Sequence, residues 1–149
     1  MKSHDNLFPI YTDGSKSDVG VGFAAVSGRF QILSSLPSHA SIFTAELFAI
    51  KNALLYIFDH DVNNTVIYTD SLSALQAINS YSLKHPIVTE IKVLLSKLIE
   101  SNSSIVLCWI PSHIGLKGNE EADKSAKNSV NAVCSENRYS IMYKIQNMA

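Results

Sequence analysis

A change in the spacing of apolar residues near residue 40 constrains the fold of this chain more than any other feature. Before that point, apolar residues alternate with other residues, which is typical of a β-strand: Val19, Val21, Phe23 and Ala25. After it, apolar residues recur at spacings of three and four, which is typical of an amphipathic helix: Leu47, Ile50, Leu54 and Ile57. The change of period predicts a sheet with helices packed against it, an α/β fold.

The expected elements are three strands followed by alternating helices and strands. The strands are 8–14, 18–28, 30–36, 65–70 and 103–110, and the helices are 41–59, 71–80, 87–100 and 119–130. We expect Gly14 to end the first strand, Gly28-Arg29 to turn the chain, and Ser71 to cap a helix. The opening strands form an antiparallel meander, and the helical crossovers predict a parallel part with the fourth and fifth strands. The fold class is therefore a mixed sheet flanked by helices.

Length and composition predict one domain and set few limits on function. The chain has 149 residues, which we divide into a domain over 1–130 and a tail over 131–149 that is either a last helix or a partly ordered linker. The net charge of −1 argues weakly against a free-standing nucleic-acid binder. No apolar run reaches the ~20 residues that a membrane helix requires. Cys108 and Cys134 lack metal-ligand spacing and favour an intracellular setting, cytoplasm or nucleus.

Two strands end on the same tripeptide, Tyr-Thr-Asp, and so place Asp13 and Asp70 at carboxyl ends of strands. Ligands of open α/β sheets gather beyond those ends. If the two strands are parallel neighbours, their backbones lie about 4.8 Å apart. Two carboxylates that close repel each other unless a cation lies between them. Hard oxygen ligands suit Mg²⁺ or Mn²⁺, so the repeat predicts a site for such an ion.

Two further acids are expected at the same edge, Glu46 near the start of helix 41–59 and Asp123 in the second turn of helix 119–130. Four carboxylates from four elements could hold a pair of divalent ions that clamp a scissile phosphate. Each acid alone has a simpler interpretation. Asp13 before Gly-Ser is often a turn residue, Glu46 can complement a helix dipole, and Asp123 can belong to a solvated face with Lys124 and Lys127. The combination favours a site.

Four segments resemble a known family: YTDGS, TAELFAI, IYTDSLSAL and WIPSHIGLKGNEEADKSAK. They are similar to the ribonuclease H type 1 domain, in the version carried by the reverse transcriptases of non-LTR retrotransposons, over roughly residues 7–130. The resemblance implies a five-stranded mixed sheet with the first and fourth strands adjacent and parallel. It also implies a magnesium-dependent endonuclease that hydrolyses the RNA strand of RNA–DNA hybrids. Two Mg²⁺ ions, with Mn²⁺ as an alternative, would act in the reaction and leave 5′-phosphate and 3′-hydroxyl ends.

The resemblance also implies roles for individual residues. Asp13 and Asp70 match the ligands of the ion that activates water, and Asp13, Glu46 and Asp123 match those of the ion at the leaving oxygen. His113 matches a loop histidine that helps proton transfer or product release, and Asn119 matches an asparagine that orders that loop. Recognition of the 2′-hydroxyl would involve four further residues near the acids: Gly14, Ser15, Thr44 and Ser71.

The chain departs from better-known members of the family at three places. Ile42 and Phe43 stand shortly before the glutamate, where relatives carry Asn or Gln, and Leu72 stands two residues after the third acid, where relatives often carry Gln. Residues 80–90 hold no basic protrusion, so we expect a monomeric domain whose affinity for hybrids comes mainly from a tethered reverse transcriptase. The principal alternative is a catalytically inactive RNase H-like connector or nucleic-acid-binding domain. A related nuclease or transposase, or a receiver-type domain, fits the motifs less well.

Overall fold

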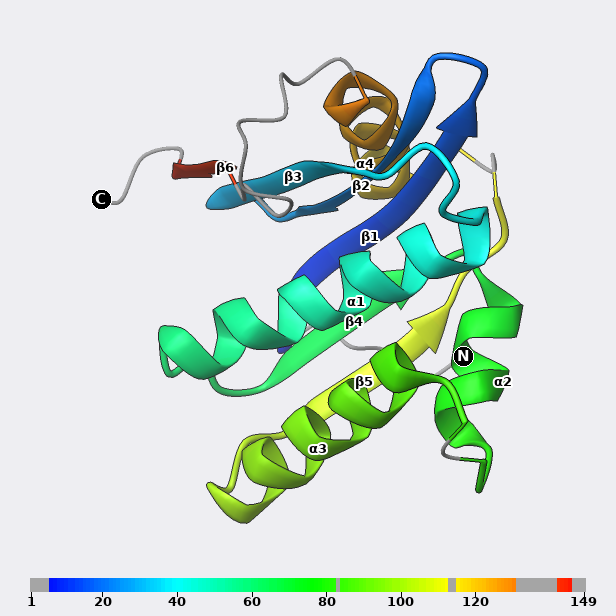
Figure 1. Ribbon diagram of the computed structural model, residues 1–149. Coiled ribbons are helices and arrows are strands. Elements are labelled where there is room, and N and C mark those ends of the chain that lie inside the picture. The colour runs from blue at the N-terminus through cyan, green and yellow to red at the C-terminus, as the bar shows by residue number, and fades with distance from the viewer. Residues whose placement is uncertain (1–5, 83, 113–114, 131–141, 146–149) are drawn as a thin grey trace.

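The computed structural model describes residues 6–82, 84–112, 115–130 and 142–145 as a mixed β-sheet with helices on both faces (Figure 1). The strands are β1 (Phe8–Ser17), β2 (Gly20–Val26), β3 (Phe30–Leu36), β4 (Thr65–Thr69), β5 (Ile105–Trp109) and β6 (Met142–Ile145). The helices are α1 (Ile42–Asp59), α2 (Leu72–Asn79), α3 (Pro86–Glu100) and α4 (Lys117–Ser129). None of these helices is long and apolar enough to cross a membrane.

The sheet order is β5-β4-β1-β2-β3-β6. β1 pairs antiparallel with β2 and parallel with β4, and β4 pairs parallel with β5. The predicted five-stranded mixed sheet is thus confirmed, with β1 beside β4. The structure adds β6, which pairs antiparallel with β3 at a place where we expected a helix or a linker. The rest of the tail lies outside the described residues, and the domain boundary at 130 stays a prediction.

Two strand boundaries differ from the prediction. Gly14 does not end β1, because it pairs with Phe23 within the antiparallel ladder and the strand continues to Ser17. β2 begins at Gly20, and Val19 lies outside it with 74% of its surface exposed, so Val19 does not belong to the apolar side of the strand. In a hairpin, a strand continues as far as its partner strand offers backbone hydrogen bonds. The spacing of apolar residues alone does not show where that pairing ends.

Side chains of β2 alternate between the two helical layers. Val21 and Phe23 pack with Ala45 of α1, whereas Ala24 and Val26 pack with α4. The apolar residues predicted for helix 41–59 are fully buried in the main core: Leu47, Ile50, Leu54 and Ile57. Burial of these residues holds α1 against the sheet.

The predicted cap of α2 is confirmed, since the Ser71 hydroxyl accepts a hydrogen bond from the Ala74 amide at 3.3 Å.

The two Tyr-Thr-Asp segments form one structural unit across β1 and β4. Tyr11 is in register with Tyr68, and their rings stack with centroids 4.9 Å apart. The Thr12 hydroxyl donates to the carbonyl of Tyr68 at 2.9 Å, and the Thr69 hydroxyl accepts from the Ser71 amide at 3.0 Å. The tripeptide therefore locks the two strands together just before each aspartate.

Gly22 allows α4 to approach β2 closely. A Cβ atom at Gly22 would overlap the Ser129 hydroxyl, whereas a Cβ at Gly28 would meet no described atom within 4 Å. We therefore expect Gly22→Ala to lower the free energy of unfolding by about 1–3 kcal/mol through overpacking. Gly28→Ala is the control and should change it by less than about 0.5 kcal/mol. Urea denaturation measures both, and equal stabilities of the two variants would contradict the close helix–sheet contact.

Candidate metal centre

Three carboxyl groups from three elements converge at the carboxyl ends of β1 and β4. Asp13 and Asp70 each follow the last registered pair of the two strands, Thr12 and Thr69. Glu46 reaches them from α1. One carboxylate oxygen from each of Asp13, Glu46 and Asp70 lies within 4.8 Å of the other two. Since Asp13 is only 4% exposed and Glu46 only 7%, the cluster is built into the fold and not spread over the surface.

Asp123 joins this cluster from the opposite face of the sheet. It lies on α4, within hydrogen-bonding reach of Asp13, and it pairs with Lys127 at 2.8 Å one helical turn further on. A depression of about 350 Å³ brings the four acids together with the starts of α1 and α2. Its lining residues are Asp13, Gly14, Ile42, Phe43, Glu46, Asp70, Ser71, Ser73, Ser112 and Asp123.

Burial and mutual repulsion disfavour the charged forms of the two innermost acids. Burial raises the pKa of Asp13 to about 8, and the charges of Asp70 and Asp123 add to the effect. Burial likewise raises the pKa of Glu46 to about 9, with the charges of Asp13 and Asp70 contributing next. A cation placed between these groups would reverse both shifts. A bound cation would therefore stabilise the ionised forms of both acids.

The donor set fits a divalent ion such as Mg²⁺ or Mn²⁺. All four charged side chains offer hard oxygen ligands, and they come from different elements of a rigid framework. Within the described residues, the buried Oε2 atom of Glu46 has no hydrogen-bond partner. A buried carboxylate oxygen without a partner is costly, and coordination of a metal ion would satisfy it.

Three donors orient two of the aspartates. The Gly14 amide donates to Asp13 Oδ1 at 3.0 Å. The Ser112 hydroxyl donates to Asp70 Oδ2 at 3.0 Å, and the Trp109 indole donates to the Asp70 carbonyl at 3.2 Å. Each hydrogen bond restricts the rotation of its carboxylate or the path of its backbone, as in well-formed metal sites.

Comparison with known proteins bears on what this acidic site is. Residues 5–131 match the family model of RNase H. The chain belongs to the RNase H family. The structure is similar in fold to RNase H1 from the halophilic archaeon Halobacterium salinarum NRC-1, with a TM-score of 0.62 and 20% identity over 85% of this chain and 98% of that chain. No curated protein matches the sequence.

Family membership confirms the coarser part of the predicted resemblance. Together with the fold, it supports a ribonuclease activity on RNA–DNA hybrids, and the acidic cluster of this RNase H domain fits a metal-dependent enzyme. No comparison addresses the non-LTR retrotransposon version of the family, so that part of the resemblance stays a prediction.

The other predicted site residues of this RNase H domain do not all lie at the acidic depression. Gly14 and Ser71 line the acidic depression, and Ser15 follows Gly14 along β1. Thr44 lies instead beside a separate hollow with Ser41, whose hydroxyl donates to it at 3.0 Å. Asn119 is buried in the first turn of α4, with no partner for its Oδ1 atom among the described residues. His113 lies outside the described residues.

Gly14 also allows β1 and α1 to pack closely, a role that the sequence did not reveal. A Cβ atom there would lie 2.9 Å from the Cβ of Ala45 and 2.9 Å from the amide nitrogen of Glu46. The missing side chain therefore makes room for α1, which carries Glu46 to Asp13. Ile42 and Phe43, which replace expected polar residues, do line the depression and make its rim partly apolar.

Ser112 and Lys127 contact the acids but were not predicted as site residues. Lys127 follows Asp123 by four positions, a spacing that could have indicated the ion pair. Ser112 lies between Pro111 and His113 with no local pattern to mark it. Its contact with Asp70 joins residues 42 positions apart, so only the fold reveals it.

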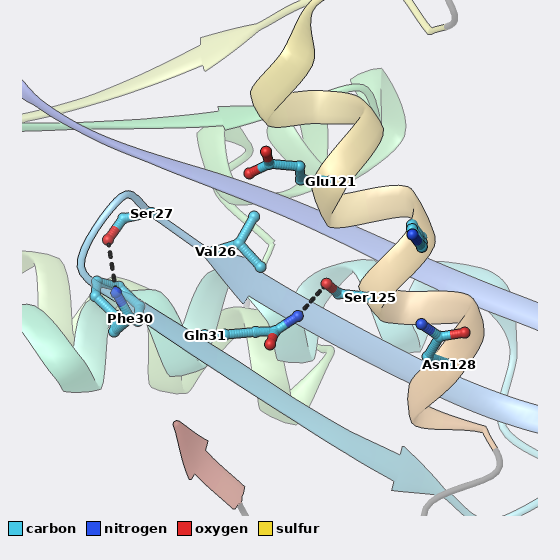
Figure 2. Close-up of a pocket in the computed structure, with 8 residues that line it drawn as sticks. Val26, Ser27, Phe30, Gln31, Glu121, Ser125 and Asn128 are labelled. Atoms are coloured by element: carbon cyan, nitrogen blue, oxygen red, sulfur yellow. Dashed lines mark hydrogen bonds between the residues drawn. The ribbon is translucent and has the colours of Figure 1, made fainter. Parts of the chain in front are cut away.

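A second depression, of about 290 Å³, lies between the β2–β3 hairpin and α4 and holds none of the four acids (Figure 2). Gln31 Nε2 donates to the Ser125 hydroxyl there, and the Phe30 amide donates to the Ser27 hydroxyl at 3.3 Å. Glu121 lines this hollow, whereas Asp123, two residues further along α4, lines the acidic one. Helical geometry thus separates the neighbouring acids.

The raised pKa values predict how metal-free stability depends on pH. Because the folded state holds protons on Asp13 and Glu46 up to pH values near 8 and 9, it binds more protons than the unfolded chain above about pH 4. Their stabilising contribution is fully present below about pH 4, decreases as the pH rises, and is lost once the pH has passed about 8 to 9. Thermal unfolding in a chelator should show the melting temperature falling between about pH 4 and pH 9 and levelling off above that.

Asp13→Asn removes one buried charge and should raise the metal-free melting temperature at pH 8 by about 2–8 °C. Asp18→Asn replaces an exposed aspartate outside the cluster and is the matched control. The gain should shrink at pH 5, where Asp13 is protonated in the native protein. A variant that is less stable than the native protein at pH 8 without metal would contradict this account of the buried carboxyl groups.

Proposed function

We propose that this domain is a metal-dependent endonuclease that hydrolyses the RNA strand of RNA–DNA hybrids and leaves 5′-phosphate and 3′-hydroxyl ends. The observation that carries the proposal is the convergence of Asp13, Glu46 and Asp70 within 4.8 Å, with Asp123 beside Asp13. Two of these groups are buried with raised pKa values, which only a cation or protons can relieve. Family membership supports the substrate class.

The four acids would hold two divalent ions, Mg²⁺ with Mn²⁺ as an alternative. When bound, such a pair supplies an activated water and stabilises the leaving oxygen. Asp13 would serve both ions, since Asp70, Glu46 and Asp123 all lie close to it. Ser112 would keep the Asp70 carboxylate in its ligand orientation, and Lys127 would do the same for Asp123. His113 would transfer a proton or help release the product.

Substrate recognition would combine backbone and hydroxyl groups near the acids. Ser71 lies in the depression, within 3.3 Å of the Ser73 hydroxyl, and could meet the 2′-hydroxyl that distinguishes RNA from DNA. Gly14, Ser15 and Thr44 would contribute along the same path, and Asn119 would order the loop of His113. Ile42 and Phe43 add apolar contacts in place of hydrogen bonds.

A tethered reverse transcriptase, as in non-LTR retrotransposons, would supply most of the affinity for the hybrid. The net charge of −1 supports this part of the proposal, because phosphate binding normally draws on excess positive charge. We place the protein inside the cell, in cytoplasm or nucleus. The principal alternative is an inactive RNase H-like connector or nucleic-acid-binding domain, and the presence of all four acids in one cluster weighs against it.

Cleavage of a labelled RNA–DNA hybrid tests the proposed activity. We expect cleavage with Mg²⁺ or Mn²⁺ and none in a chelator, with 5′-phosphate ends on the products. Asp70→Asn should lower the rate by more than about 100-fold, since loss of a metal ligand removes several kcal/mol of transition-state stabilisation. Asp18→Asn should cleave as the native protein does.

The same assay includes matched double-stranded RNA and double-stranded DNA. Absence of hybrid cleavage at every concentration of either metal would favour the inactive connector. Cleavage by Asp70→Asn at the native rate would show that the site is assigned wrongly, and equal cleavage of double-stranded RNA would contradict the substrate class.

A further inference from the structure

Helix α4 faces the sheet with a seam of small residues. They recur at spacings of four, four and three: Gly118, Ala122, Ala126 and Ser129. The two alanines pack on Ala24 and Val26 of β2, and Ser129 lies against Gly22. Small residues on both sides allow the helix backbone to approach the strands closely. The seam begins at Gly118, in the first turn of α4.

Gly118 lies directly against the ring of Tyr11. A Cβ atom at position 118 would overlap three atoms of that ring. The ring cannot move aside freely, because it stacks on Tyr68 with centroids 4.9 Å apart and an interplanar angle of 23°. The register of β1 with β4 holds both tyrosines in place. The start of α4 therefore rests on a platform made by the two tyrosines.

The Tyr11 contact and the Asp13–Asp123 approach both join β1 to α4. Asp123 follows Gly118 by five residues, about 7.5 Å along a helix, and Asp13 follows Tyr11 by two residues, about 6.7 Å along a strand. Gly118 meets Tyr11 at the start of α4, and Ser129 meets Gly22, the partner of Ser15 of β1, at its end, so α4 runs along β1 in the same direction. The distance of the start of α4 from β1 therefore influences how near Asp123 lies to Asp13.

We propose that Gly118 and the stacked Tyr11–Tyr68 pair are positioning residues that set the separation of Asp123 from Asp13. This inference rests on the proposed function, in which those two aspartates share a metal ion. A side chain at position 118 would lift the start of α4 from the sheet and carry Asp123 away. Asp13, Glu46 and Asp70 would keep their places, because none of them lies on α4. The tyrosine of each Tyr-Thr-Asp segment then helps to position α4, in addition to the role of the aspartate.

A double-mutant cycle on the full chain tests the positioning role. The four proteins are the native protein, Gly118→Ala, Tyr11→Ala and the double variant, with Gly28→Ala as the glycine control. The readout is Mn²⁺ affinity from electron paramagnetic resonance titration, with the Mn²⁺-induced rise in melting temperature as a second measure. Gly118→Ala should weaken Mn²⁺ binding about tenfold in the native background and less than about threefold in the Tyr11→Ala background.

Asp123→Asn separates positioning from general damage to the fold. It should weaken Mn²⁺ binding in the native background and cause no further loss in the Gly118→Ala background, because the aspartate is already displaced there. Equal penalties for Gly118→Ala with and without the Tyr11 ring would overturn the proposal, as would native affinity in Gly118→Ala. If Gly118→Ala does not fold, the comparison of the double variant with Tyr11→Ala decides the question: Mn²⁺ affinities within about threefold of each other support the proposal, and a further loss of about tenfold in the double variant overturns it.

The same titration distinguishes failure of the proposed function. If neither Asp70→Asn nor Asp123→Asn changed Mn²⁺ affinity in the native background, the metal site itself would be wrong, and the positioning role would fall with it. If both weakened binding while Gly118→Ala did not, the metal site would stand and only the positioning role would be overturned.

Discussion

The structure depends on holding two neighbouring carboxyl groups, Asp13 and Glu46, inside the protein. Burial and mutual repulsion raise their pKa values to about 8 and 9, so the arrangement weakens the metal-free fold as the pH rises. Such a cost is typical of functional sites, where a ligand later offsets it. Without a cation, the carboxyl ends of β1 and β4 therefore hold two acids whose ionisation destabilises the fold.

Two helices that pack closely on β1 bring Glu46 and Asp123 to Asp13. Gly14 leaves space for the start of α1, which brings Glu46, and Gly118 leaves space for the start of α4, which brings Asp123. The Tyr-Thr-Asp segments supply the frame between them, with stacked rings on the side of α4 and threonine hydroxyls bound to the backbone. The repeat thus pairs β1 with β4 and places a carboxyl group directly after the last parallel residue pair on each strand.

The sequence predicted the parts of this arrangement that local patterns encode. Apolar periods marked β2 and α1, the parallel crossovers placed Asp13 beside Asp70, and the cap at Ser71 followed from its position before a helix. Contacts between distant segments left no such pattern, so Ser112 at Asp70 and Gly118 at Tyr11 emerged only from the fold. β6 was missed because residues 131–149 show no clear period, and the extension of β1 past Gly14 required knowledge of its partner strand.

The central claim is that the four acids form a divalent metal site, and anomalous diffraction from crystals soaked in Mn²⁺ tests it most directly. The account predicts a peak in contact with carboxylate oxygens of Asp13, Glu46 and Asp70, and a second one beside Asp123 when an RNA–DNA hybrid is bound. Absence of any peak among these residues at saturating Mn²⁺, in crystals whose acidic depression is open to solvent, would contradict it.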